Sequence, residues 1–310
     1  MTVDFTSYFP YPTMREGQQT TLETAEQTIN DWEVLVVRAP VACGKSGIAV
    51  AIQAGLNALE KSCAIVTPNN ILRDQYLTDF PTLRTVKSQD DYMIPAKTIY
   101  HGRMRLPHST MSVKEYRRQY GTWPRGNEYT KDLNAVKRKL TPSVLNTYGY
   151  LAHKLYKDVV IFDEAHELLD MLRELHSKTI WQRKHGYPDG LKTFGDLMAW
   201  ADKNRGKDNV ELLYNELSKE HPASVIEYTE DFYFGELEPC IKIKPLHVKD
   251  KSPILWPDKV KRLVLMSATI SQKDLEYLGL GDRVVKFVDT PSPIPKENRR
   301  IIPLNACSMA

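Results

Sequence analysis

The stretch RAPVACGKSG, at positions 38–47, constrains the fold of this 310-residue chain more than any other. Before it, EVLVVRA (33–39) is a β-branched run typical of a strand buried on both faces. After it, KSGIAVAIQAGLNALEK (45–61) has the pattern of a helix. The unpaired N–H groups at a helix N-terminus, together with the helix dipole, favour bound phosphate. A strand, a tight loop and a helix in this order therefore predict a phosphate-binding loop.

The loop departs at one position from the pattern G-x-x-x-x-G-K-[ST], because Ala39 stands where the first glycine is usual. The loop entrance needs a small residue more than a positive φ, so we expect the loop to bind nucleotide. Gly44 would let the backbone approach the phosphates, Lys45 would reach the β- and γ-phosphates, and the Ser46 hydroxyl would ligate Mg²⁺. A chance match to the pattern is the alternative. The remaining backbone donors are expected from the preceding residues, Ala42 and Cys43.

A second motif, VVIFDEAH (159–166), supplies the carboxylates that nucleotide hydrolysis needs. An apolar strand would deliver Asp163 and Glu164 together at its carboxyl end, where ligands bind in open α/β sheets. Asp163 is predicted to hold Mg²⁺, and Glu164 to take the proton from the attacking water. We expect this strand to adjoin the strand that enters the loop. Adjacent acids alone are common on exposed turns, so they indicate a hydrolytic site only in combination with the loop.

The rest of the chain repeats the alternation of strand and helix. Further buried strands are predicted at CAIVTP (63–68), RLVLMSAT (262–269) and RVVKFVD (283–289). Further helices are predicted at about 15–30, at 70–80 behind an Asn69 cap, at 141–155 with Pro142 in the first turn, and at 271–280. This alternation predicts an α/β fold with a mainly parallel central sheet flanked by helices.

The charge of the chain is unevenly spread. The whole chain carries only +3, but residues 84–157 hold fifteen Lys or Arg against five Asp or Glu, a net of +10. Aromatic side chains alternate with these cations, and bases stack on such rings while cations follow the phosphates, so the stretch suits a single strand. A solvated basic face with its aromatics in the core is the alternative. The candidate contacts are Thr67, Asn69, Arg103, Arg105, Arg117, Arg118, Trp123 and Tyr148.

Together the motifs resemble a known family. APVACGKS, TPNNILRDQ, FDEAH and LMSATI occur in the order of motifs I, Ia, II and III of superfamily-2 helicases, and YPTMREGQ (11–18) resembles their Q motif. The layout resembles the XPD/DinG branch of DEAH-type helicases. The resemblance implies that Gln18 and Arg15 contact the adenine side of ATP. It also implies that His166 joins motif II to motif III, with Ser267 and Thr269 as its partners in a coupling role. The alternative is that these residues only cap the end of a strand.

The resemblance also implies a domain layout. It places a first RecA-like domain at 1–83, 141–170 and 246–290, a basic aromatic insertion at 84–140, and a mostly helical, arch-like insertion at 171–245 that ends in a hairpin. Related enzymes often carry an iron-sulfur cluster in the first insertion, but no cysteine lies between Cys63 and Cys240, so no cluster is expected. The chain stops about 40 residues after SAT. We therefore expect 291–310 to be a linker toward a second RecA-like domain that lies outside this sequence.

The function predicted on these grounds is that of an ATP-dependent helicase or translocase motor lobe. It would use ATP and Mg²⁺, bind single-stranded DNA or RNA and, if the relatives are a guide, move 5′ to 3′. Without a second domain and its arginine fingers, which are worth ~10³ to 10⁵ in rate, the chain alone would be weak or inactive. The alternative is a nucleic-acid-binding or regulatory protein with little turnover. A P-loop kinase would leave SATI and the basic stretch unexplained.

We expect the protein to be cytoplasmic and not to bind a membrane. No apolar run approaches the roughly 20 residues that a membrane span needs, and the N-terminus MTVDFTSYFPYP lacks the regions of a signal peptide. The four scattered cysteines form no C-x-x-C pair that would indicate disulfides or a metal site.

Overall fold

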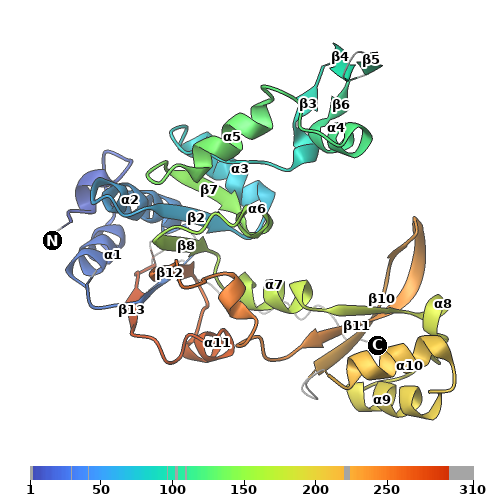
Figure 1. Cartoon of the computed structure of the whole chain (residues 1–310). Coiled ribbons are helices and arrows are strands. Elements are labelled where there is room, and N and C mark those ends of the chain that lie inside the picture. The colour runs from blue at the N-terminus through green and yellow to red at the C-terminus, as the bar shows by residue number, and fades with distance from the viewer. Residues whose placement is uncertain are drawn as a thin grey trace, which may run out of the picture. The chain divides into compact units, whose positions relative to one another are not determined.

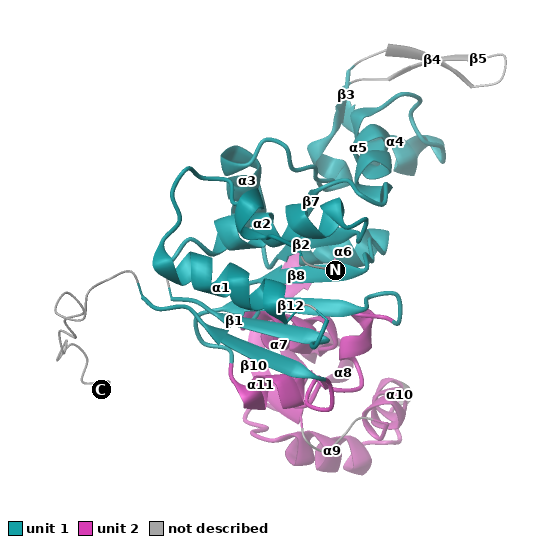
Figure 2. Ribbon diagram, turned by 90° about the vertical axis from the view of Figure 1, so that its left-hand side faces the viewer, with its two compact units in different colours: residues 1–165, 258–270, 284–310 teal, residues 166–257, 271–283 magenta. Residues whose placement is uncertain are grey.

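The computed structural model describes residues 3–28, 30–40, 42–95, 97–101, 104–108, 110–219 and 224–292, with the backbone alone at 97–101, 104–108 and 208. The chain forms two compact units (Figure 2). The first consists of Met1–Ala165, Asp258–Ile270 and Val284–Ala310, and the second of His166–Pro257 and Ser271–Arg283. No helix within the described residues is both long and apolar enough to cross a membrane.

A six-stranded parallel sheet is the centre of the first unit (Figure 1). Its strand order is β13-β1-β12-β8-β2-β7. Nearly all side chains of the four inner strands are buried, which explains why those strands read as continuous apolar runs. The sheet confirms the predicted fold class. Its strands are β1 (Val34–Arg38), β2 (Cys63–Thr67), β7 (Ser143–Asn146), β8 (Val159–Asp163), β12 (Arg262–Ser267) and β13 (Val285–Asp289).

Helices pack against this sheet through an apolar core. Leu22 of α1, Ile48 and Ile52 of α2 and Tyr76 of α3 are at most 1% exposed and belong to one buried cluster with Ile65 of β2. The helices of this unit outside its insertion are α1 (Glu16–Gln27), α2 (Lys45–Ala58), α3 (Asn70–Asp79) and α6 (Thr147–His153), with a 3-10 turn η1 (Thr6–Tyr8).

The predicted helix at 141–155 is wrong in its first half. Residues 143–146 instead form the edge strand β7, in which Val144 pairs with Ile65 and Leu145 with Val66. Both apolar side chains are fully buried, so the sheet gains more from them than a helix would. Asn146 ends the strand, and its Oδ1 accepts a hydrogen bond from Gly149 N at 2.6 Å, which starts α6.

The prediction that the two motif strands are adjacent in the sheet is also wrong. β8, which carries the acids, does not adjoin β1, because β12 lies between them. β12 pairs with β1 through Val37 and Met266, and with β8 through Met266 and Asp163. The three strands still end at the same edge of the sheet, so both motifs lie at that edge.

The basic stretch folds as an insertion of short elements between β2 and β7. Tyr129 is buried at its centre, where the Tyr92 ring meets it edge-on at 5.4 Å and Tyr92 Oη donates to Asp132 Oδ2 at 2.8 Å. The elements are η2 (Gln89–Asp91), β3 (Met93–Ile94), β4 (Lys97–His101), β5 (Met104–His108), β6 (Met111–Ser112), α4 (Val113–Tyr120) and α5 (Glu128–Lys137).

The second unit is built on a three-stranded antiparallel sheet with the order β10-β11-β9. The predicted hairpin is confirmed as β10 (Ser224–Tyr233) and β11 (Glu236–Pro245), whereas the third strand, β9 (Lys178–Trp181), was not predicted. Ile180 and Ile241 of this sheet share a core with Leu197 and Leu213 of two helices. The other elements are α7 (Glu167–Leu175), α8 (Gln182–His185), α9 (Phe194–Lys203), α10 (Asp208–Leu217), η3 (Ser252–Ile254) and α11 (Gln272–Tyr277).

Candidate functional site

The polar ends of the parallel strands meet at the carboxyl edge of the sheet. Arg38 ends β1, Ser267 ends β12 and Asp163 ends β8, in that lateral order. This edge is where open α/β sheets bind their ligands. The candidate nucleotide residues therefore belong to one site in the first unit.

In the phosphate loop, the residues with positive φ angles come after position 39, where the first glycine of the pattern is replaced by alanine. Ala39 is fully buried, and its N–H donates to Ser267 O at 2.9 Å, as if it extended β1. The left-handed conformations fall instead on Ala42 (φ 65°) and Gly44 (φ 80°). As predicted, position 39 holds a small residue and does not need a positive φ. Val41 lies outside the described residues.

Two residues ahead of the loop hold it in place. Gln18 Nε2 donates to Cys43 O at 2.9 Å, and Gln18 Oε1 accepts from Arg15 N at 2.9 Å. The Arg15 guanidinium donates to Ala42 O. A Cβ on Gly44 would lie 2.3 Å from Gln18 Nε2, so only glycine allows this approach. The amide of Gln18 therefore contacts the loop itself, and its contact with adenine stays a prediction.

The Lys45 ammonium and the Glu164 carboxylate meet at the mouth of the site. Lys45 Nζ lies 2.6 Å from Glu164 Oε1, and the two side chains are 11% and 28% exposed. Glu164 has a φ of 50°, which is costly for a residue other than glycine and marks a constrained turn. The turn after β8 thus directs the Glu164 side chain to the lysine of the phosphate loop.

Asp163 lies beneath this pair and is almost completely buried. Tyr76 Oη donates to Asp163 Oδ2 at 2.9 Å, and Glu164 N donates to Oδ1 at 3.0 Å. Burial raises the pKa of Asp163 above its usual value, and the charge of Glu164 adds to this, while the hydrogen bond from Tyr76 and the charge of Lys45 oppose it. Tyr76 was missed by the sequence reasoning, because nothing in a helix sequence indicates a contact 87 residues away.

The site offers the donors that a magnesium nucleotide requires. The first N–H groups of α2 have no intrahelical acceptor, and Lys45 is the first residue of that helix. Mg²⁺ prefers oxygen ligands, which the Ser46 hydroxyl and the Asp163 carboxylate supply. The described residues hold no cluster of three or more His, Cys, Asp or Glu that would bind a metal alone, so phosphate oxygens would complete the shell. The residues therefore fit Mg²⁺ bound together with a nucleotide.

A small cavity opens beside the loop, where a base would follow the phosphates. Its volume is about 170 Å³. Gly17 lies against it, and a Cβ there would come within 2.9 Å of Pro291 Cδ. Burial raises the pKa of the Cys43 thiol, which indicates a packing role and not a reactive one. The lining residues are Arg15, Glu16, Gly17, Gln18, Cys43, Thr290, Pro291 and Ser292.

The three predicted coupling residues have different settings. Ser267 is fully buried, and its Oγ accepts from Thr269 N at 3.1 Å, so the two shape the turn after β12. Thr269 is exposed. His166 follows the acids as the N-terminal flanking residue of α7 and begins the second unit. Their coupling role stays a prediction.

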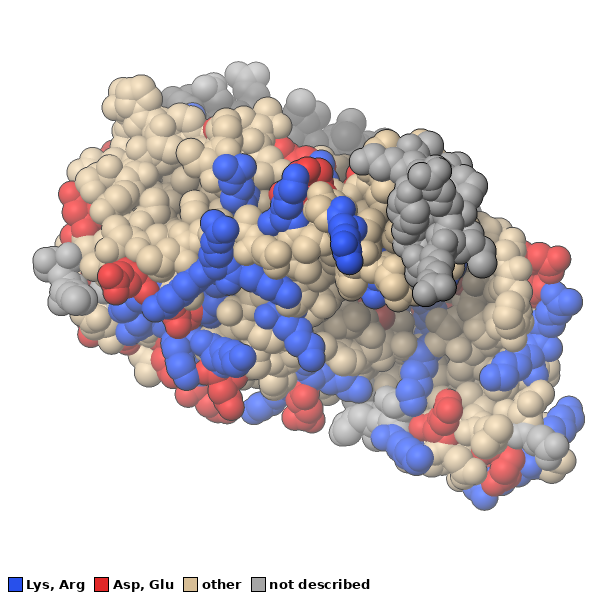
Figure 3. Space-filling model, turned by 45° about the horizontal axis from the view of Figure 1, so that its top comes forward, with Lys and Arg blue, Asp and Glu red and all other residues tan. Residues whose placement is uncertain are grey.

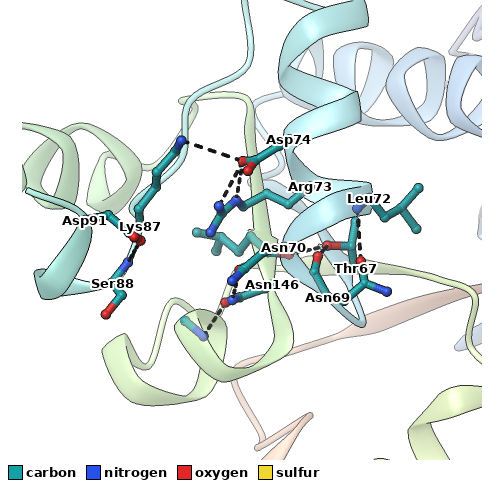
Figure 4. Close-up of polar contacts among 12 residues, drawn as sticks. Thr67, Asn69, Asn70, Leu72, Arg73, Asp74, Lys87, Ser88, Asp91 and Asn146 are labelled. Atoms are coloured by element: carbon teal, nitrogen blue, oxygen red, sulfur yellow. Dashed lines mark hydrogen bonds and ion pairs between the residues drawn. The ribbon is translucent and has the colours of Figure 1, made fainter.

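The carboxyl edge continues from the nucleotide site to β2 and β7. Figure 4 shows Asn70 of α3 facing Asn146 at the end of β7, with Asn146 Nδ2 donating to Asn70 Oδ1 at 2.5 Å. Thr67 is fully buried and its carbonyl accepts from Thr147 Oγ1 at 3.0 Å, whereas Asn69 is exposed and caps α3 through Leu72 N. Thr67 therefore shapes this edge, and Asn69 is available to a ligand.

The predicted contacts of the basic insertion differ in what they offer. Trp123 lies between two partners, with the Arg117 guanidinium 3.8 Å from its ring centre and the Tyr129 ring stacked at 5.4 Å. A base could stack on Trp123 only if Arg117 moved, so the exposed face of Arg117 is the better platform. Tyr148 is 54% exposed and Arg118 is exposed on α4. Arg103 lies outside the described residues, as does the side chain of Arg105.

The model of the family described as "Type III restriction enzyme, res subunit" matches residues 11–185, more than half of the chain. The chain belongs to this family. No curated protein matches the sequence. The matched range of this res-subunit family member contains the phosphate loop, both acids and the whole basic insertion.

One solved structure supports the fold. The chain is similar to a structure titled "XPD_Helicase", with a TM-score of 0.52 and 13% identity over 90% of this chain and 63% of that one. Another match is titled "Truncated XPD", with a TM-score of 0.46 and 13% identity over 89% of this chain and 100% of that one. The res-subunit family member thus covers about 63% of the length of the first structure and shares its fold.

Proposed function

We propose that this helicase-type motor domain binds and hydrolyses ATP with Mg²⁺ and couples hydrolysis to movement along a single nucleic-acid strand. The observation that carries the proposal is the 2.6 Å contact between Lys45 and Glu164 at the carboxyl edge, with buried Asp163 next to it. A lysine, a partly exposed carboxylate and a buried carboxylate are the three charged groups that P-loop hydrolysis needs.

Each residue of the nucleotide site has a proposed role. Lys45 and the backbone of Ala42, Cys43 and Gly44 hold the β- and γ-phosphates, since the α2 N-terminus favours negative charge there. Ser46 and Asp163 would hold Mg²⁺, which would offset charge on the phosphates. Glu164 orients the attacking water and accepts its proton. Gln18 and Arg15 are proposed to face the base from the small cavity beside the loop.

The strand is proposed to run along the ends of β2 and β7 and onto the basic insertion. A cavity of about 360 Å³ lies there, with Lys87 and Lys114 on the insertion side and the exposed ring of Tyr148 on α6. Cations beside an exposed aromatic ring suit phosphates and a stacked base. Figure 3 shows a face of the molecule on which lysine and arginine side chains gather. The other polar residues of the cavity are Ser88, Gln89, Asn146 and His153.

The remaining parts of the proposal follow from the family resemblance. Ser267, Thr269 and His166 would transmit the state of the nucleotide to the strand. The direction of movement would be 5′ to 3′. A second RecA-like domain in the full-length protein would supply the arginine fingers.

The test separates nucleotide binding from hydrolysis with two variants of the site. Lys45→Ala removes the phosphate contact, so we expect binding of a fluorescent ATP analogue with Mg²⁺ to weaken at least 10-fold, in line with the loss of one charge-assisted hydrogen bond. Glu164→Gln keeps the shape of the side chain, so we expect binding to stay within about threefold of wild type while turnover of the full-length protein falls about 100-fold or more.

The outcomes decide between the candidate functions. Unchanged ATP affinity in Lys45→Ala would refute the nucleotide site. Retained strand binding, with no turnover even in the full-length wild-type protein, would instead support a nucleic-acid-binding or regulatory protein. Thermal unfolding of each variant serves as the control for folding, because each substitution removes one member of the ion pair.

A further inference from the structure

A second cavity lies entirely within the second unit, apart from the nucleotide site. Its volume is about 630 Å³, within the range typical of ligand pockets. The edge strand β9 and the helices α8 and α10 line it, and the end of β10 closes it through Tyr233. Its floor is apolar, because Ile180, Leu213 and Leu217 of the unit's core reach it.

The charged groups around this cavity are mostly cationic. Lys178 of β9, Lys184 of α8 and Lys219 after α10 line it, against a single acid, Glu216. Lys184, Lys219 and Glu216 are exposed. Three ammonium groups over an apolar floor favour a ligand that combines negative charge with a flat apolar body.

Three aromatic rings continue from the cavity to the tip of the hairpin. The Trp181 and Tyr233 rings, both lining the cavity, have centres 4.9 Å apart, and the Phe234 ring meets Tyr233 edge-on at 4.6 Å. Phe234 is 93% exposed and has a φ of 52°, a conformation that favours glycine or asparagine. An apolar side chain that is both exposed and strained indicates a contact surface more than a packing role.

We infer that this cavity and its aromatic rings bind consecutive nucleotides of a single nucleic-acid strand. The bases would stack on Trp181, Tyr233 and Phe234, and Lys184 and Lys219 would follow the phosphates. The inference rests on the single-strand binding proposed above and adds a second contact region, in a part of the chain where the sequence offers no chemical motif. An acidic peptide would use the lysines but would leave the row of rings without a partner.

The test uses a single-stranded oligonucleotide with 5-iodouracil at each pyrimidine position, which forms a covalent adduct with a stacked aromatic ring under ultraviolet light. The full chain is irradiated with this probe, and the modified peptides are identified by mass spectrometry. We expect adducts on Trp181, Tyr233 or Phe234, in addition to adducts on Tyr148 in the first unit. Adducts on Tyr148 alone would overturn this inference and leave the proposed strand path intact. No adduct anywhere would count against both.

A charge reversal gives an independent measurement. The double variant Lys184→Glu/Lys219→Glu should weaken oligonucleotide binding and reduce the slope of log affinity against log salt by roughly 1.4, since each lost phosphate contact on a single strand is worth about 0.7. The matched control is Lys192→Glu/Lys203→Glu, which makes the same charge change at exposed lysines of this unit outside the cavity. Equal slopes for the two double variants would overturn the inference, and melting curves would show that both are folded.

Discussion

At the scale of single residues, the site is organised around a carboxylate in an environment that opposes its charge. Asp163 is 5% exposed, and burial is the main cause of its raised pKa. Such a group costs stability in the folded chain at neutral pH, because its ionised form is better solvated when the chain is unfolded. A bound Mg²⁺ would remove this disadvantage. Asp163 is therefore expected to contribute to function and to weaken the fold.

Replacing Asp163 with Asn tests this balance. The folded-state pKa is raised, so the cost of the charge sets in as the pH rises above the unfolded value of about 3.9 and is complete above the folded-state pKa. We expect Asp163→Asn to melt at a higher temperature than wild type at pH 7, and the difference to shrink toward pH 4. Mg²⁺-dependent ATP binding should be lost.

The control for this prediction is Glu164→Gln, which removes a partly exposed carboxylate from the same turn. A variant at Asp163 that melts lower than wild type at pH 7 would show that the hydrogen bonds from Tyr76 and Glu164 N outweigh burial.

At the scale of elements, the hairpin of the second unit has a turn that its sequence does not favour. Tyr233 pairs with Glu236, so Phe234 and Gly235 alone form the loop, and both have positive φ angles. Two-residue hairpin loops of this kind prefer Asn-Gly. We expect Phe234→Asn to raise the free energy of unfolding by about 1 kcal/mol, because asparagine adopts this conformation at lower cost. The measurement is chemical denaturation.

The matched control is Phe232→Asn, since Phe232 is also an exposed phenylalanine of this hairpin but lies within β10. A gain of equal size at both positions would show that loss of exposed apolar surface, and not turn geometry, is the cause.

Local patterns allowed most elements to be predicted, and long-range pairing explains the misses. Asn69 caps α3 as expected, because its hydrogen bond to Leu72 N spans three residues. The strand β7 was missed because Pro142 imitates a helix start and the strand itself contains only two apolar residues, Val144 and Leu145. The place of β12 between β1 and β8 depends on segments more than 100 residues apart. No local pattern can determine that order.

The candidate site was predictable for the same reason. The loop and the two acids each follow directly from a buried strand, so strand ends alone place them at one edge. The sequence did not indicate which side chains from different helices, strands and loops contact one another. The stack of Arg117, Trp123 and Tyr129 and the hydrogen bond from Tyr76 to Asp163 both join separate segments.

At the scale of the whole molecule, charge is concentrated in one region and the total is small. The net +10 of residues 84–157 contrasts with +3 for the chain. We expect single-strand binding to depend steeply on salt despite the low net charge, with a log–log slope of about −3 if four phosphates are contacted. Fluorescence anisotropy with a labelled oligonucleotide at increasing NaCl would measure it. A slope near zero would mean that the basic stretch does not bind the backbone, and melting curves at each salt concentration would confirm that the chain stays folded.

The position of β12 has a mechanical consequence. Met266 O accepts from Ala165 N and Ser267 O accepts from Ala39 N, each at 2.9 Å, so adjacent carbonyls of one strand anchor the start of the phosphate loop and the end of the acidic turn. A small shift of β12 along its axis would pull on both segments at once. A movement of either segment on nucleotide binding would therefore reach the other through β12.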